Sequence, residues 1–447
     1  MYIDYIQLRH TLHFPQIQLN FDFKKTPVTL ILGEQSTGKS ALIRNIFHAL
    51  SWFAARAKDS RSPGIVMPDH DIMHKRLQSK IEIQVSISEE LLGLEHSTSV
   101  NPSARWQLYK TLNSQGIGVS KVELDELSEC IELYHKAQRI DAKFALPLIA
   151  YYPADRFVSD IQLISKNNPA NLNPHAAYDV VPLPFVTFSR FFEWFRDVSD
   201  IEHAQTTYML QQLLKQHHAN EEFFFSQKLA QSYSEMTAPA LRALNHAVSI
   251  VFPEVTHLQL SYQPKLQIVA HYQGQDVAFQ QLSNSLRNGI ALVGDIVRRL
   301  CLLNPASLTP CSEGQGILLI DNIDHQLDET SNSVILQRLN QAFPQLQIIA
   351  TGCQESLLHQ DIPMQCVRLN QKKIQNIELH ATSFDDWYEQ VSEDVEQPQA
   401  LVFEPLQDRV TQFFDDITQN LNAEELQLLI DRLAGQQKQP FGQEIPE

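Results

Sequence analysis

Cysteine is scarce in this sequence, and its five cysteines form no CxxC pair. An odd number of cysteines without paired spacing argues against a disulfide framework and against a zinc cluster. No apolar run approaches the roughly 20 residues that span a bilayer, and residues 1–5 lack the basic and apolar regions of a secretory leader. We therefore expect a protein of a reducing compartment, the cytoplasm, without a membrane partner.

Positive charge is also in short supply. Lys and Arg number 35 against 52 Asp and Glu, which gives a formal net charge of −17. Coating nucleic acid requires Lys and Arg that replace counterions, so this balance argues against such a role. A local basic patch such as Lys75–Arg76 stays open, although a solvated charged face is the ordinary interpretation. The length of 447 residues suffices for one large domain with an insertion, or for two to three domains.

The first fifty residues show strand patterns that lead into a helix. Apolar and polar residues alternate over 3–8 and again over 17–23, which predicts a half-exposed hairpin. The continuous apolar run Val28–Leu32 predicts a buried central strand, and from Ser40 the apolar residues follow helical spacing for about four turns. Further strands are expected over 81–87, 106–112, 146–152, 258–262, 266–272, 277–279 and 316–320. Further helices are expected over 191–195, in two pieces over 201–250, over 286–303 and over 423–434.

The strongest motif is Gly33–Ser40, which reads GEQSTGKS and matches the pattern GxxxxGK[ST] between a predicted strand and a predicted helix. Its glycines let the backbone wrap closely around phosphates, so that N–H groups and the positive end of the helix face the anion. We expect Lys39 to reach the β- and γ-phosphates of ATP, and the Ser40 hydroxyl to bind Mg²⁺. The residues expected to hold the nucleotide here are Gly33, Glu34, Gln35, Ser36, Thr37, Gly38, Lys39 and Ser40.

A second motif places an acidic residue at the end of an apolar strand. A P-loop ATPase needs a carboxylate that holds the hydrated Mg²⁺, and Asp321 after the run 317–320 is the candidate. Four apolar residues and an Asp are common by themselves. Together with the first motif, far away along the chain, they predict a split ATPase whose middle is filled by an insertion.

Further stretches resemble a known family. Residues 316–327 and 341–351 look like the Walker B and post-Walker B region of the RecF/SMC-like ABC-type ATPases. Within these, the sequence is most similar to the PtuA group of Septu and retron anti-phage defence systems, which is also resembled by residues 148–156, 191–196, 302–305 and 314–316. The resemblance implies an α/β P-loop NTPase fold like an ABC/SMC head, with a mixed sheet flanked by helices and a helical insertion.

We expect the chain to have four parts. Residues 1–150 would form the N-terminal part of the ATPase head with Walker A, and residues 151–255 an insertion with a helical arm. Residues 256–385 would form the C-terminal part of the head with the signature and Walker B. Residues 386–447 are an acidic tail with one predicted helix, which could dock a partner.

The resemblance also implies a head-to-head dimer. In that family two heads sandwich ATP, and a signature segment of the form LS-x-G contacts the γ-phosphate bound to the other head. The matching stretch here has Ser285 in place of the glycine, which adds bulk at a close approach. Ser283 can still donate to a phosphate oxygen, and the resemblance implies that Ser283, Asn284 and Ser285 face the nucleotide of the partner head.

Two positions that the resemblance marks as catalytic are changed. The catalytic Glu that follows the Walker B Asp is Asn322, which cannot accept a proton, and the switch His aligns with Gly352. Removing a general base typically costs about 10²–10⁴-fold in rate. Asp324 is the candidate for a substitute base. We expect a head that binds ATP with Mg²⁺ and hydrolyses it slowly or not at all.

Two other features have ordinary alternatives. Arg156 follows a predicted buried strand and could either reach a phosphate or form a structural ion pair. The aromatic helix over 191–195 could be a base-stacking platform, although aromatic residues at neighbouring helical positions usually cover a core.

Three functions stay open at this point. The first is an ATP-sensing regulatory subunit of an anti-phage defence complex, in which a head dimer controls a separate nuclease effector, often of HNH type in the family, and meets nucleic acid through that partner. The second is an active SMC/RecF-like ATPase in DNA repair or maintenance. The third is a scaffold in which ATP is purely structural. ATP turnover separates the first function from the second.

Overall fold

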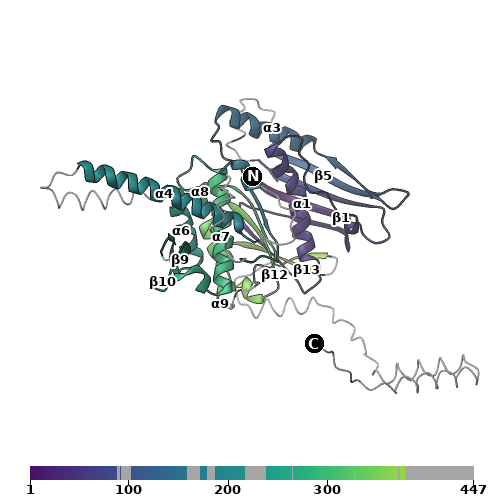
Figure 1. The fold of residues 1–447 in the computed structure, drawn as a ribbon. Helices are drawn as coiled ribbons and strands as arrows, with labels where there is room; N and C mark the ends of the chain where they lie inside the picture. The colour runs from purple at the N-terminus through teal and green to yellow at the C-terminus, as the bar shows by residue number, and fades with distance from the viewer. Residues whose placement is uncertain are drawn as a thin grey trace, which may run out of the picture. The chain divides into compact units, whose positions relative to one another are not determined.

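A six-stranded sheet forms the centre of the computed structural model (Figure 1). The structure describes residues 1–87, 91, 102–158, 172–178, 187–216, 238–263, 265–325, 327, 329–370 and 373–377. The order of the strands is β14 (Lys373–Ile377), β13 (Met364–Asn370), β3 (Val28–Leu32), β12 (Leu346–Gly352), β11 (Gly316–Ile320) and β7 (Leu148–Tyr152). All pair in parallel except β14, which runs antiparallel to β13. Strands β3, β11 and β12 are buried along their whole length, as expected of parallel strands covered on both faces.

The register of the parallel strands brings their carboxyl ends to one edge of the sheet. Leu32 of β3 pairs with Gly352 of β12, and Ile320 of β11 pairs with Ala350 of the same strand. Ile320 also pairs with Tyr152, the last residue of β7. The loops after these four strands therefore leave the sheet side by side, although they lie far apart in the sequence.

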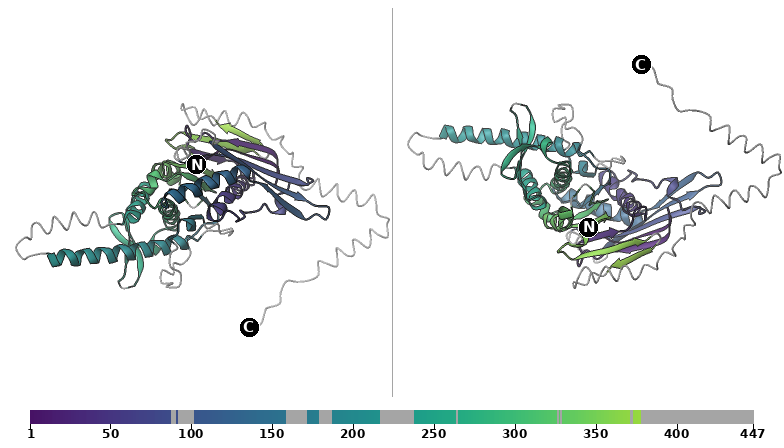
Figure 2. Two further views of the ribbon diagram at one scale, coloured as in Figure 1. Left: turned by 90° about the horizontal axis from the view of Figure 1, so that it is seen from above. Right: turned by 90° about the horizontal axis from the view of Figure 1, so that it is seen from below.

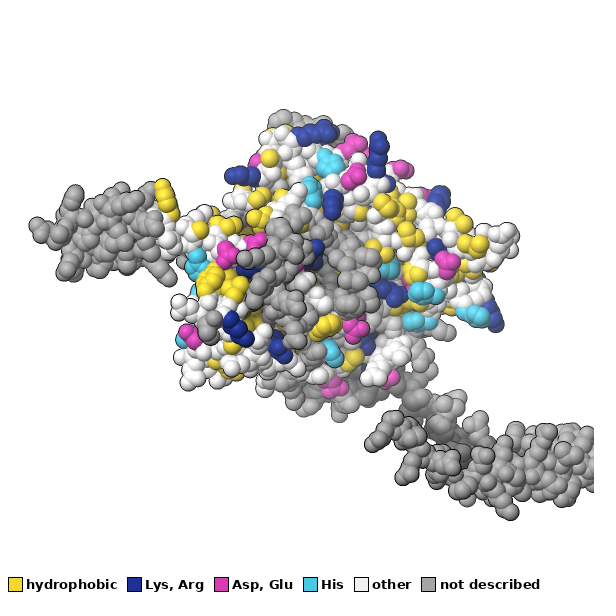
Figure 3. Space-filling view, in the orientation of Figure 1, with side chains coloured by type: hydrophobic (Ala, Val, Ile, Leu, Met, Phe, Trp, Pro, Cys, Tyr) yellow, Lys and Arg dark blue, Asp and Glu magenta, His cyan; other side chains and the backbone are white. Residues whose placement is uncertain are grey.

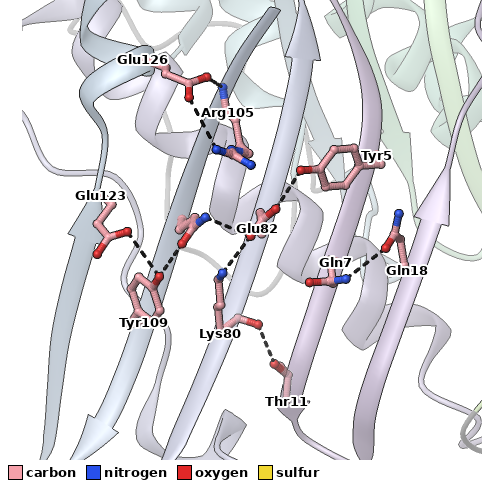
Figure 4. A network of polar contacts seen from close by, with 11 residues as sticks. Tyr5, Gln7, Thr11, Gln18, Lys80, Glu82, Arg105, Tyr109, Glu123 and Glu126 are labelled. Carbon is pink, nitrogen blue, oxygen red and sulfur yellow. Dashed lines mark hydrogen bonds and ion pairs between the residues drawn. The ribbon is translucent and has the colours of Figure 1, made fainter.

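An antiparallel sheet of five strands forms a second layer. Its order is β2 (Phe14–Asn20), β1 (Tyr2–Thr11), β4 (Gln78–Ser86), β5 (Ser103–Leu112) and β6 (Gly118–Glu123). Its outward-facing polar side chains bond to one another across the strands (Figure 4). At the centre of this face Glu82 accepts from the Tyr5 hydroxyl at 2.7 Å, from Lys80 Nζ at 2.8 Å and from Gln107 Nε2 at 2.9 Å. Pairs of this kind stabilise a sheet across its strands.

Helix α1 (Lys39–Lys58) contacts strands of both sheets, and α3 (Asp125–Ile140) packs beside it (Figure 1). The buried Trp106 of β5 donates its indole N–H to the Ala49 carbonyl oxygen at 2.9 Å. Phe53 of α1 meets Tyr134 of α3 edge to face, with ring centroids 5.4 Å apart. The helix that begins at the predicted phosphate loop is thus held by the core on several sides.

Helices and a small sheet make up the second half. They are α4 (Ser189–Gln216), α6 (Pro239–Val251), β8 (Val255–Ser261), β9 (Gln267–Tyr272), β10 (Gln275–Ala278), α7 (Asn284–Leu303), α8 (Pro310–Glu313), α9 (Glu329–Asn332) and α10 (Ile335–Ala342). Short 3-10 turns lie at Asp69–Asp71, Pro174–Tyr178, Phe279–Gln281 and Glu355–Leu358. Helix α4 extends away from the sheets (Figure 2). At its base Phe191 packs against Gly294 of α7, where a Cβ atom would lie only 2.3 Å from the ring.

Most elements expected from the sequence are present. The N-terminal hairpin, the central strand β3 and the β8–β10 meander are confirmed, and α1 has 20 residues, more than the four turns expected. Elements that were not predicted from the sequence include β6, α3, α10 and β13. The helix expected over 423–434, and the whole tail 386–447, lie outside the described residues.

The aromatic helix is not a base-stacking platform. Phe191, Phe192, Trp194 and Phe195 are each at most 4% exposed, so their ring faces are not available to bases. On the face shown in Figure 3, Lys and Arg side chains are scattered among acidic and apolar ones and do not gather in one patch. No helix in the described part of the chain is both long and apolar enough to cross a bilayer.

Candidate nucleotide-binding site

The loop Gly33–Ser40 connects β3 to α1, and it needs glycine at its last turn. Gly38 has a φ of 96°, in the left-handed region that glycine adopts without strain. A Cβ atom there would lie 2.3 Å from Cε1 of His13 and 2.7 Å from Cζ of Phe14. His13 Nε2 also lies 3.0 Å from the Thr37 carbonyl oxygen. The tip of the β1–β2 hairpin therefore supports the loop from outside.

Lys39 fits a bound phosphate. Its ammonium group donates to the carbonyl oxygens of Gly33 at 2.6 Å and of Glu34 at 2.8 Å, and the residue is 6% exposed. Within the described residues it forms no ion pair with a carboxylate. A buried positive charge without a counter-charge among the described residues, beside the N–H groups of the first turn of α1, suits a polyanion such as the triphosphate of ATP.

The structure brings the two predicted magnesium residues together. Ser40 Oγ donates to Asp321 Oδ1 at 3.0 Å, across the space between α1 and the end of β11. The hydroxyl of Thr351, at the end of β12, donates to the same oxygen at 2.5 Å. Asp321 is 3% exposed. A hydroxyl and a carboxylate oxygen are ligands that Mg²⁺ accepts, so Ser40 and Asp321 would hold the ion and neutralise phosphate charge.

Asn322 stands directly after the magnesium aspartate, in an unusual conformation. Its φ is 46°, which is left-handed backbone in a residue that carries a Cβ atom. Its backbone N–H donates to Thr351 Oγ1 at 2.8 Å, and its carbonyl oxygen accepts from the backbone N–H of His325 at 3.0 Å. An amide side chain cannot remove a proton from water, so this position supplies no general base.

Asp324 is already committed to the backbone. Its Oδ2 accepts from the N–H groups of Cys353 at 2.7 Å and of Gln354 at 2.8 Å, and the residue is 6% exposed. The two amides that this carboxylate binds favour a structural role for Asp324 over that of a base.

Gly352 is the position that aligns with the switch His. The space beside it is filled, because a Cβ atom there would lie 2.2 Å from Cδ1 of Leu357.

Within the described residues Arg156 forms no ion pair with a carboxylate, the structural contact considered for it from the sequence. Its guanidinium donates to three backbone carbonyl oxygens, those of Pro153 at 3.0 Å, Asp321 at 2.5 Å and Asn322 at 2.7 Å. Burial lowers its pKa to about 10, against the charges of Asp321 and Asp324, so the group is still protonated at neutral pH. It is thus a buried cation that is satisfied by carbonyl groups.

The signature residues lie at the start of α7. Ser283 Oγ accepts from the Leu286 N–H at 3.2 Å and caps the helix, and Asn284 Oδ1 accepts from Arg287. Ser285 lines a cleft with Arg156. Within the described residues no hydrogen bond joins this segment to the loop Gly33–Ser40.

Three residues of the site were not assigned from the sequence. His13 supports the loop, Thr351 bonds Asp321, and Arg156 bonds the backbone around Asn322. Each lies outside the two contiguous motifs and reaches the site only through the tertiary structure. The sequence offered a signal for two of them, since Thr351 ends an apolar strand and Arg156 follows one.

A glycine-rich loop between a strand and a helix, with its Ser bonded to a strand-end Asp on the same sheet, defines a P-loop NTPase of the α/β class. More particularly, the chain belongs to the AAA domain family AAA_23, whose model matches residues 6–245, more than half of the sequence.

Curated relatives carry retron names. The chain is 24% identical to the retron Vc95 probable ATPase of Vibrio cholerae serotype O1 biovar El Tor, over 74% of this chain and 66% of that protein. It is 24% identical to the retron Ec83 probable ATPase of Escherichia coli, over 79% of this chain and 69% of that protein. The chain thus spans about two thirds of the length of the curated relatives it matches. The chain is thus similar in sequence to two proteins named as probable ATPases of retrons.

Solved structures of SMC heads also resemble the chain. The SMC head bound to the C-winged helix domain of ScpA gives a TM-score of 0.44 at 13% identity, covering 85% of this chain and 99% of that one. The SMC head from Thermotoga maritima gives 0.40 at 12% identity, covering 85% and 100%.

Proposed function

We propose that this protein is the ATP-binding regulatory subunit of an anti-phage defence complex, in which Mg-ATP acts as a conformational latch and hydrolysis is weak or lost. The single observation that carries this proposal is an intact magnesium pair beside an absent base. Ser40 and Asp321 are bonded at 3.0 Å, whereas the next residue is Asn322 and Asp324 is engaged by backbone amides. Such a site can hold a nucleotide without consuming it quickly.

A latch requires that bound ATP changes the assembly. In this proposal ATP is held by Gly33–Ser40 of one head and contacted by Ser283, Asn284 and Ser285 of a second copy. The position of those residues at the start of α7, separate from the loop of their own chain, supports a head-to-head dimer. The triphosphate would then join two heads, and its loss would release them.

The effector would be a separate polypeptide. The retron names of the curated relatives support a place in anti-phage defence, and a nuclease of the HNH type is the partner that we propose. Nucleic acid would be contacted through that partner or through the whole complex. Residues 386–447 are proposed as a docking segment for it.

Equilibrium dialysis with radiolabelled ATP tests the nucleotide site. We expect magnesium-dependent retention by the full chain, and a loss of at least about a hundredfold in affinity for Lys39→Ala, because several charge-assisted bonds disappear. Lys25→Ala is the matched control, since Lys25 lies before β3, away from the loop Gly33–Ser40 in sequence, and its side chain is 84% exposed. Unchanged retention by Lys39→Ala would refute the site.

Turnover and assembly test the latch. Steady-state phosphate release from the wild type should stay close to that of Lys39→Ala, whereas sedimentation should show a larger assembly with Mg-ATP than with ADP. Many turnovers per head, abolished by Lys39→Ala, would instead favour the active ATPase of DNA repair. An identical sedimentation profile with ATP, ADP and no nucleotide would exclude a latch and favour a scaffold.

A further inference from the structure

The backbone turn after β11 is held in a conformation that Asn322 would not favour by itself. A φ of 46° is uncommon in a residue with a Cβ atom, although Asn adopts it more readily than most such residues. Such a conformation persists only when its surroundings enforce it. The turn also carries Asp321, whose carboxylate must stay beside Ser40 for a magnesium ion to bind both.

Two residues hold this turn from opposite sides. Thr351 Oγ1 donates to the Asp321 carboxylate and accepts from the Asn322 N–H. On the other side, the guanidinium of Arg156 donates to the carbonyl oxygens of both Asp321 and Asn322. No other side chain among the described residues donates to these two carbonyl oxygens. The fork of Arg156 therefore bonds two successive peptide units, one on each side of the left-handed Asn322.

Arg156 is itself fixed in place. It is 7% exposed, and its third bond, to the Pro153 carbonyl oxygen at 3.0 Å, joins it to the chain just after β7. Strand β7 pairs with β11 in parallel, and the Asp321 N–H donates to the Tyr152 carbonyl oxygen at 2.9 Å. The guanidinium thus has a rigid base from which to hold the neighbouring turn.

We infer that Arg156 is a positioning residue, which fixes the Asp321–Asn322 peptide and thereby keeps the Asp321 carboxylate in the place where it binds magnesium. The inference deepens the proposed function and rests on it. Loss of the fork would let the turn relax towards right-handed backbone and would move the carboxylate away from Ser40. The phosphate site at Lys39 would be left unchanged.

The magnesium-dependent part of ATP affinity measures this role. We compare the ATP dissociation constant with Mg²⁺ and with EDTA, by calorimetry on the full chain. Arg156→Lys keeps the charge but cannot bond two carbonyls with one planar fork. We expect ATP binding to weaken about 10- to 100-fold with Mg²⁺, the usual loss for an outer partner of a metal ligand, and to stay within about twofold in EDTA. Arg190→Lys, on the exposed side of α4, is the control.

Other outcomes would overturn the inference. An equal loss with Mg²⁺ and with EDTA would mean that Arg156 contacts phosphate or that the whole site is disturbed. No loss under either condition would mean that the fork positions nothing. If the wild type itself bound ATP no better with Mg²⁺ than without, the proposed function would fail together with this inference, and the two failures are thus distinguishable.

A rescue variant separates positioning from general packing. Glycine adopts left-handed backbone without strain, so adding Asn322→Gly to Arg156→Lys should recover at least about threefold of the lost magnesium-dependent affinity. The double variant also decides the question if Arg156→Lys alone does not fold, because glycine adopts the left-handed conformation without the help of the fork. Absence of any magnesium dependence in a folded double variant would refute the inference.

Discussion

Replacing Asp295 by Asn tests how α7, which begins at the signature, is fixed to the central sheet. The Asp295 carboxylate accepts from Arg298 Nε and Arg299 Nε of its own helix, each at 2.8 Å. It also accepts from the hydroxyl of Tyr152, the last residue of β7, at 2.8 Å. One buried carboxylate therefore ties the helix to the strand beside β11.

The expected cost depends on burial. Asp295 is 3% exposed and Arg298 is 5% exposed, so Asp295→Asn leaves two guanidinium groups beside a neutral amide with little water to compensate. Breaking a buried ion pair by removing one partner costs about 3–5 kcal/mol. Because Asn keeps one acceptor oxygen, we expect a loss of about 3 kcal/mol, out of a total stability on the order of 5–15 kcal/mol.

The stabilisation by the Asp295 carboxylate should depend on pH in a defined direction. Burial alone would raise the pKa of Asp295, but the charges of Arg298 and Arg299 outweigh it and hold that pKa well below its usual value of 3.8. A depressed pKa in the folded state contributes stability that is present above the unfolded value and is lost as the pH falls towards the folded value. The difference between wild type and variant should be constant from pH 5 to 8 and shrink below about pH 4.

Urea unfolding monitored by circular dichroism measures the difference in the free energy of unfolding between wild type and Asp295→Asn. Asp22→Asn is the control, because the Asp22–Lys25 pair is 51% and 84% exposed and such pairs contribute at most about 1 kcal/mol. If the free energies of unfolding of the two variants at neutral pH agreed within about 0.5 kcal/mol, the carboxylate would not fix α7 to the sheet.

Three further predictions concern the site and the core. Asn322→Glu should raise ATP turnover by about a hundredfold if only the base is missing, with phosphate release as the assay and loss upon Lys39→Ala as the check; no increase would mean that more than a base is absent. Gly38→Ala should weaken ATP binding at least about tenfold in dialysis, since its φ is 96° and a Cβ atom would meet His13 at 2.3 Å; full retention would contradict the loop geometry. Burial lowers the pKa of His48 to about 4, so its contribution to stability is present above the unfolded value of 6.5 and lost as the pH falls towards 4. In wild type the free energy of unfolding should therefore fall between pH 7 and pH 4.5. His48→Gln should reduce this fall by up to about 3 kcal/mol, as measured by urea unfolding at both pH values. A fall of the same size in the variant would contradict the prediction.

Elements with a strong local pattern could be predicted. The alternation over 3–8 and 17–23 predicted β1 and β2, because a strand with one face on the core and one in water repeats every two residues. Helix α3 offered a usable signal that the interpretation did not use: Leu127, Cys130 and Ile131 lie at helical spacing and are buried. Tertiary packing, by contrast, decided how far α1 continues beyond its first turns.

The residues of the nucleotide-binding site also fall into those that a local pattern predicts and those that depend on the tertiary structure. Lys39, Ser40 and Asp321 were predicted because each lies in a contiguous motif whose chemistry is local. Thr351 was not predicted, and Arg156 was considered without its backbone partners, since the contacts of both depend on which strand lies next to which. Asp324 was considered as a base, but its two amide donors come from a loop after another strand.

The sequence by itself determined that a loop of eight residues can surround a phosphate, because the spacing of glycines, Lys39 and Ser40 along the chain decides which amides and which ammonium converge. Only the tertiary structure decided the partners of Asp321. The strand order β3-β12-β11-β7 brings Ser40, Thr351 and Arg156 to one aspartate from three distant segments. Parallel strands end at a common edge, and that edge is a property of the sheet rather than of any one segment.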